Sequence, residues 1–119
     1  TLCFPDMIGF RRGTCLPFKL FNIKENTTLN IYEIPLLAMD TTLSGYMKLS
    51  TNEAYNKILE LLNDVNKYNG LFTFLWHPGN CSDEWNIWLK EVYEKTLSYL
   101  SNKSVESICG KDISLKFKG

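Results

Sequence analysis

Three polar side chains stand directly after apolar runs of the sequence: Arg11, Asp40 and His77. A histidine can exchange protons near neutral pH, a carboxylate can orient it, and an arginine can hold a second carboxylate. The carboxyl ends of parallel strands meet at one edge of a sheet or at the mouth of a barrel. We therefore expect Arg11, Asp40 and His77 to meet in space as catalytic residues.

Each of these residues also has an ordinary structural interpretation. His77 could be a hydrogen-bonded residue at a strand end, and Arg11 could be a solvated cation beside Arg12. Asp40 could cap a turn over residues 41–44. The sequence leaves Trp76 undecided between the core and a platform for sugars.

Other chemistries find little support. No Gly-rich phosphate loop and no GxSxG nucleophile elbow is present, and His77 with Cys81 lacks an orienting group for thiol catalysis. The four cysteines form neither a CxxC motif nor a zinc-type Cys/His spacing, which argues against a Cys zinc site and favours reduced, structural thiols.

Two helices and several strands are expected to position the candidate residues. Ser50 and Glu53 form a capping box before an apolar stripe, which predicts a helix over residues 51–68 with a left-handed stop at Asn69-Gly70. A second amphipathic helix is predicted over residues 83–100.

The expected strands are short. Residues 7–10 and 34–40 read as strands, and the aromatic run 71–76 reads as a strand buried on both faces. Residues 19–30 suggest a surface excursion, and 113–117 a terminal edge strand. The order strand, helix, strand, helix predicts an α/β fold with parallel strands and crossover helices, either an open sheet or part of a barrel.

Three segments carry a resemblance to a known family. IGFRRGTCLPF at residues 8–18 resembles the GFRxGTCxPF signature of a bacterial branch of the NodB-like polysaccharide deacetylases. MDTTL at 39–43 is similar to that branch's MDxTL, and LWH at 75–77 is similar to the LxH motif. The resemblance covers most of the chain, in the family's order.

The resemblance implies a distorted (β/α) barrel and a metal-dependent hydrolase, commonly a zinc enzyme, that removes acetyl groups from a polysaccharide. It implies that His77 is the general acid, that Arg11 holds the catalytic base, and that Asp40 pairs with His77 and favours its protonated form. Leu75, Trp76 and Phe18 would line the saccharide site.

The family's paired aspartates and HxxxH-type ligands are absent, because His77 is the single histidine. Residues 1–119 therefore resemble the C-terminal half of the catalytic domain. The divalent metal's ligands are expected outside this chain, which we expect to be inactive alone and to pair with the missing half or with itself. The alternative is a non-catalytic saccharide-binding or interaction module of the same origin.

Bulk properties exclude several classes of partner. Thirteen Lys and Arg balance thirteen Asp and Glu without clustering, which argues against nucleic acid or anionic lipid as a partner. Apolar runs are too short for a membrane span. The start at Thr1 without Met or an apolar leader suggests a cut piece, and the sequence leaves cytoplasm and cell envelope equally open.

Overall fold

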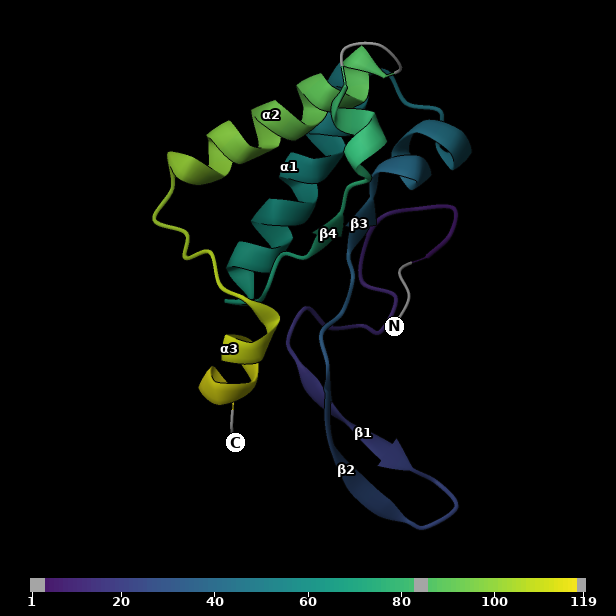
Figure 1. Cartoon of the computed structure of the whole chain (residues 1–119), viewed down its shortest axis with the longest axis vertical. Coiled ribbons are helices and arrows are strands. Elements are labelled where there is room, and N and C mark those ends of the chain that lie inside the picture. Colours follow the sequence, from purple (N-terminus) through teal and green to yellow (C-terminus); the bar gives the residue numbers. More distant parts are fainter. Residues whose placement is uncertain (1–3, 83–85, 118–119) are drawn as a thin grey trace.

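The computed structural model describes residues 4–82 and 86–117 of the 119-residue chain. Its elements form two separate two-stranded sheets together with helices (Figure 1). In chain order they are β1 (Phe18–Asn22), β2 (Thr27–Glu33), β3 (Ala38–Met39), the π-helix η1 (Thr42–Tyr46), α1 (Thr51–Lys67), β4 (Phe74–Leu75), the 3-10 turn η2 (Pro78–Cys81), α2 (Ile87–Ser101) and α3 (Gly110–Lys116).

A β3–α1–β4 crossover carries the candidate residues. β3 and β4 pair in parallel, with Ala38 opposite Phe74 and Met39 opposite Leu75. One more backbone bond, 3.0 Å from the Leu37 amide to the Thr73 carbonyl, precedes the ladder. The aromatic run thus contains a parallel strand, as predicted, but the strand is only two residues long, and it is not buried on both faces because Leu75 is exposed.

The predicted barrel is wrong. Within the described ranges, the parallel pairing consists of β3 and β4 alone, and the second sheet is antiparallel. The expected strand 34–40 is reduced to two residues, because Pro35 has no amide hydrogen to donate. The expected strand 7–10 does not form. Gly9 there has φ 137°, a left-handed value outside the strand region.

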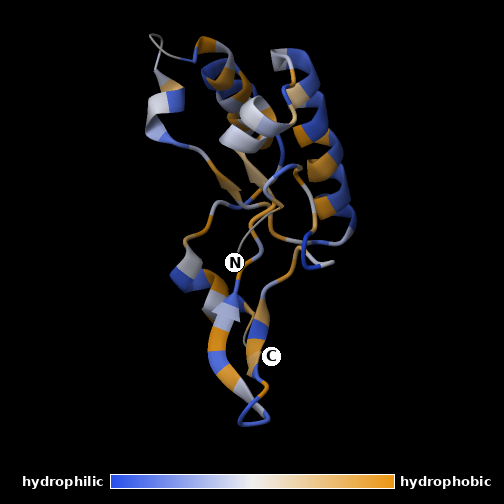
Figure 2. Ribbon diagram, turned by 90° about the vertical axis from the view of Figure 1, so that its right-hand side faces the viewer, coloured by the Kyte–Doolittle hydropathy of each residue, from blue (hydrophilic) through white to orange (hydrophobic). Residues whose placement is uncertain are grey.

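Residues 18–33 form an antiparallel hairpin instead of the expected irregular excursion. Phe18 pairs with Glu33 and Asn22 with Thr27, with an irregularity between them, and Asn26 in the turn has φ 51°. The hairpin points away from the helices, and apolar and polar residues alternate along it (Figures 1 and 2). The sequence did not predict these strands, because neither face of the hairpin is fully buried and both strands therefore mix polar and apolar residues.

Helix α1 forms as its sequence predicts. The Ser50 side chain accepts from the Glu53 amide, and the Glu53 carboxylate accepts in return from the Ser50 amide. One face of α1 packs into the core, and polar residues face outward (Figure 2). Its buried residues are Ala54, Ile58, Leu61, Leu62 and Val65.

The stop after α1 uses its two residues differently. Asn69, with φ 50°, adopts the left-handed conformation. Gly70 is required for space instead. A Cβ on Gly70 would lie 2.1 Å from the Cys15 sulfur and 3.3 Å from the Cys15 carbonyl oxygen. This close approach joins the N-terminal segment to the residues that lead into β4.

The remaining helices differ in part from expectation. α2 packs against α1, where Val92 joins Ala54 and Ile58 in one core cluster, and the predicted start of this helix at 83–85 lies outside the described residues. The edge strand expected at 113–117 is wrong, since α3 occupies Gly110–Lys116 with Ile113 buried. Alternation over five residues was too short a signal to separate a strand from one helical turn and a half.

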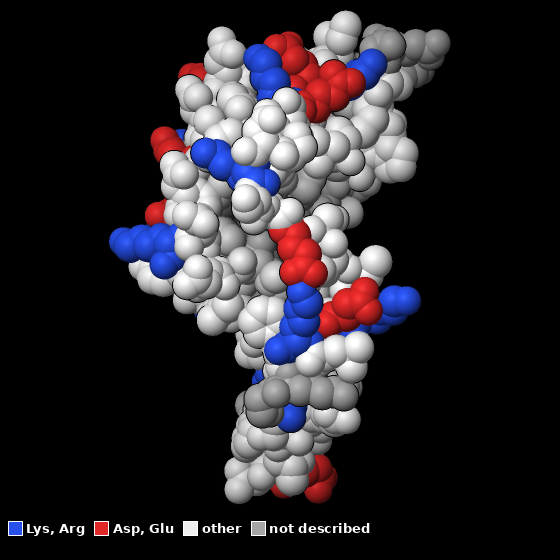
Figure 3. Space-filling model, turned by 90° about the vertical axis from the view of Figure 1, so that its left-hand side faces the viewer, with Lys and Arg blue, Asp and Glu red and all other residues white. Residues whose placement is uncertain are grey.

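The molecule is elongated, with principal extents of 49 × 32 × 24 Å. Positive and negative side chains are interspersed on the face shown in Figure 3. Across the described ranges, none of the helices is both long and apolar enough to cross a bilayer.

Candidate functional site

The Asp40 carboxylate is the centre of a hydrogen-bond network at the end of β3. Its Oδ1 accepts from the Thr41 amide at 2.7 Å and lies 2.8 Å from Nδ1 of His77. Its Oδ2 accepts from the His77 amide and from Nδ2 of Asn80, both at 2.7 Å. The residue is fully buried. All four contacts are short, so this carboxylate is held in one orientation.

The network keeps Asp40 ionised. Burial alone would raise the pKa of Asp40, but the hydrogen bonds from Asn80, from the amide and ring of His77, and from the Thr41 amide outweigh it. The net result is a pKa below the ordinary value of an aspartate. Asp40 therefore places a negative charge beside the His77 ring.

The charge on Asp40 fixes the hydrogen-bonding role of the His77 ring. An ionised carboxylate only accepts hydrogen bonds, so Nδ1 of His77 must carry the proton. The ring's other nitrogen, Nε2, is then the atom that gains or loses a proton. About half of the side chain is exposed (51%), so the ring can meet a molecule from solvent. Asp40 and His77 thus form an oriented carboxylate–imidazole pair, an arrangement that can transfer protons.

Two asparagines extend the network toward α2. The Asn80 carbonyl oxygen accepts from Nδ2 of Asn86 at 2.6 Å while its own amide nitrogen donates to Asp40. Asn80 lies in η2, where its backbone amide donates to the His77 carbonyl at 2.9 Å. Asn86 is the N-cap of α2. Sequence reasoning missed both asparagines, although the Pro-Gly-Asn turn directly after His77 was a signal for a side chain that folds back.

The turn interpretation of Asp40 also holds in part. Besides binding His77, its carboxylate accepts from the Thr41 amide at the start of the π-helix. The Met47 amide donates to the Thr42 carbonyl at 2.9 Å, which is the wide spacing of a π-helix. Such turns are frequent at functional sites. One carboxylate therefore both begins this turn and orients the histidine.

Arg11 does not follow β3 in the same direction as Asp40. Pro5 accepts from the hydroxyl of Thr42, after β3, whereas the Gly9 amide donates to the Leu37 carbonyl, before β3. The segment therefore runs opposite to β3 and carries the Arg11 backbone toward the strand's beginning. The structure brings together Asp40 and His77.

The three residues expected to line a saccharide site are dispersed. Phe18 begins β1 in the hairpin, remote from the ends of β3 and β4 (Figure 1). Leu75 is 42% exposed. Trp76 packs against Phe74 and Tyr93, with ring centroids 5.9 and 5.6 Å away, and its indole nitrogen is buried without a hydrogen-bond partner among the described residues. The Trp76 ring is thus part of the core packing.

The described residues do not fit a catalytic metal. No three Cys, His, Asp or Glu side chains come together within the ranges described, and a catalytic zinc normally takes three protein ligands. The described cysteines, Cys15, Cys81 and Cys109, are free thiols, and burial raises the pKa of Cys15. Cys3 lies outside the described residues.

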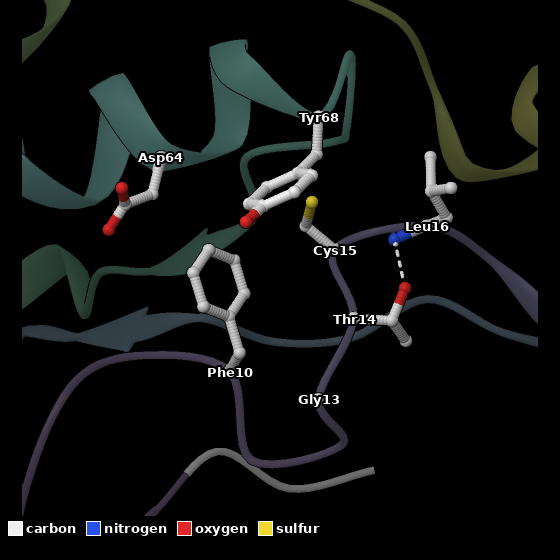
Figure 4. Close-up of a pocket in the computed structure, with 7 residues that line it drawn as sticks. All are labelled: Phe10, Gly13, Thr14, Cys15, Leu16, Asp64 and Tyr68. Carbon is white, nitrogen blue, oxygen red and sulfur yellow. Dashed lines mark hydrogen bonds between the residues drawn. The ribbon is translucent and has the colours of Figure 1, made fainter.

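A cavity of about 510 Å³ lies at the other end of the crossover, away from His77. The side chains of Phe10, Cys15 and Tyr68 point toward one another there (Figure 4). Tyr68 caps the end of α1, and the Cys15 carbonyl accepts from the Leu71 amide, so the cavity sits where the strand run begins. Of the GFRRGTC segment, Phe10, Gly13, Thr14 and Cys15 line this cavity.

Comparisons with known proteins give one similarity. The chain is 36% identical over 88 residues to a protein of Ureaplasma parvum serovar 3 named "Uncharacterized protein UU030". The match covers 71% of this chain but spans only 11% of that protein's length. No family model matches the chain, and no solved structure matches it.

Proposed function

We propose that this chain supplies the proton-transfer pair of a hydrolase that removes acetyl groups from a glycan. The observation that carries the proposal is the 2.8 Å contact between Nδ1 of His77 and the buried, ionised Asp40. The substrate class comes from the resemblance of residues 8–18, 39–43 and 75–77 to the deacetylase motifs. A divalent metal would be held by residues outside this chain.

The proposed chemical step needs one proton at a defined atom. As water adds to the acetyl carbonyl and the C–N or C–O bond breaks, Nε2 of protonated His77 donates to the leaving nitrogen or oxygen. A base in the complete protein takes the proton of the attacking water. The hydrogen bond between Asp40 and Nδ1 holds the His77 ring in place for this transfer. Arg11 as the holder of that base stays a prediction.

The alternative, a non-catalytic saccharide-binding module, has less support. Such modules present exposed aromatic faces to sugars, whereas Trp76 is packed between Phe74 and Tyr93. An exposed histidine with a buried, ionised partner is more than sugar binding requires. We therefore favour the hydrolase.

Acetate release by the complete protein tests the proposal. His77→Gln retains a side-chain donor for Asp40 but cannot exchange protons, so kcat should fall about 100- to 10,000-fold on an acetylated oligosaccharide with the fold intact. Ser98→Ala on α2 is the control and should leave kcat unchanged. Saccharide binding without acetate release by the wild type would support the binding module. Near-normal turnover by folded His77→Gln would show that His77 is not the general acid.

A further inference from the structure

The strongest unexplained feature of the site is the direction of its asparagine chain. Asn86 donates to Asn80, and Asn80 donates to Asp40, with distances of 2.6 and 2.7 Å. All three side chains are at least half-buried, so these bonds are partly shielded from water. The chain ends on the carboxylate that orients His77.

An asparagine amide has a donor end and an acceptor end, and its orientation is set by its neighbours. Asp40 binds the amide nitrogen of Asn80, because an ionised carboxylate can only accept hydrogen bonds. Asn86 donates a hydrogen bond to the other end of the Asn80 amide, so the carbonyl oxygen of Asn80 must lie there. Both hydrogen bonds require the same orientation of the Asn80 amide, which is therefore fixed.

We propose that Asn80 and Asn86 are positioning residues that hold His77 in its Nδ1-protonated tautomer. With Asn80 bound to Oδ2, the carboxylate cannot rotate freely, and Oδ1 remains 2.8 Å from Nδ1 of His77. Because Asn86 is the N-cap of α2, the start of that helix sets the position of the chain of bonds. That this tautomer is used in catalysis rests on the proposed function. That the asparagines hold the tautomer does not depend on it.

Asn86→Asp is the sharpest variant. The Asn86 side chain makes no cap hydrogen bond to α2, so replacing it with aspartate removes none and should preserve the helix. The new carboxylate cannot donate to Asn80 and would instead accept from its amide nitrogen, which turns the Asn80 oxygen toward Asp40. Two facing acceptors repel each other, so the carboxylate of Asp40 would lose its fixed orientation.

Because His77 is the single histidine, its ring nitrogens give an unambiguous NMR signal. In the neutral ring, two-bond proton–nitrogen spectra should show Nδ1 alone protonated in the wild type. Asn86→Asp and Asn80→Ala should lose this single state and show both tautomers in exchange. Asn102→Ala, which removes an asparagine bond to the Ser98 carbonyl elsewhere on α2, should keep it.

The proposal is overturned if folded Asn86→Asp, with helicity equal to the wild type, retains one Nδ1-protonated tautomer. It is equally overturned if the wild type already populates both. Neither result depends on turnover, so they are separable from a failure of acetate release. Single-tautomer spectra without any deacetylation would uphold the positioning role and reject the proposed reaction.

Discussion

Oδ1 of Asp40 lies 2.8 Å from Nδ1 of His77, across 37 residues of chain. The two are brought together because β3 and β4 run side by side in the same direction, so that both strands end at one edge. The carboxylate also accepts from the His77 amide at 2.7 Å, and thus binds both the ring and the backbone of one residue. This double attachment fixes the ring relative to the strand end.

Asp40 should make folding stability depend on acidity. Its pKa is lowered in the folded protein, so the stability it provides is complete above the unfolded value of about 4 and is lost as the pH falls through the folded value. Asp40→Asn should reduce stability at neutral pH and flatten the slope below pH 4 by up to about 1.4 kcal/mol per pH unit.

Urea unfolding between pH 2.5 and 7 measures this slope, with the exposed Asp64→Asn as the matched control. Parallel stability curves for wild type and Asp40→Asn would contradict the linkage.

Gly70→Ala should destabilise the protein by about 1–3 kcal/mol, the usual cost of forcing a methyl group into a packed site. The added carbon would lie 2.1 Å from the sulfur of Cys15. Cys15→Ala in the same chain should recover part of the loss, but not all of it, because the Cβ of residue 15 at 2.9 Å and its backbone oxygen at 3.3 Å remain. Thermal unfolding of the four proteins of this double-mutant cycle measures the coupling.

Gly79→Ala is the control, since nothing lies within 4 Å of a Cβ at that position. Strictly additive effects of Gly70→Ala and Cys15→Ala would show that the predicted contact is absent.

The thiols should differ strongly in reactivity. Cys15 is buried and its pKa is raised, so it offers little thiolate, whereas Cys109 is exposed. A short iodoacetamide pulse followed by peptide mass spectrometry should label Cys109 first and Cys15 only after urea is added. Equal labelling of both in the folded protein would show that Cys15 is not buried there.

Self-association is expected through the hairpin. Phe21, Ile23 and Ile31 are 54, 86 and 56% exposed, and the hairpin is a sheet of two strands. Two-stranded sheets with free edges tend to add further strands. Sedimentation velocity should show concentration-dependent association that Ile31→Lys weakens more than Asn30→Lys, while a concentration-independent monomer would contradict it.

The local parts of the fold could be predicted, and the global part could not. The capping box at Ser50 and the apolar stripe of α1 are complete within one segment, so the sequence alone identified the helix. The pairing of Asp40 with His77 followed from the rule that parallel strands end together. The barrel failed because it required further parallel strands, and residues 18–33 pair with each other instead.

The missed parts depend on contacts that no periodic pattern encodes. Asn80 and Asn86 matter through the orientation of two amides, which is set in three dimensions. Arg11 stands after an apolar run, as Asp40 does, but its segment runs the opposite way along β3. A linear sequence gives the position of a strand end without its direction in space.

The β3–α1–β4 crossover also affects the order in which parts of the chain fold. The entropy of closing a loop rises only with the logarithm of its length, and α1, a helix able to form early, shortens the span that must close. The Asp40–His77 pair can therefore assemble while the hairpin and α3 are still unfolded. Pulsed hydrogen exchange during refolding should therefore protect amides of α1 and His77 before those of β1 and β2.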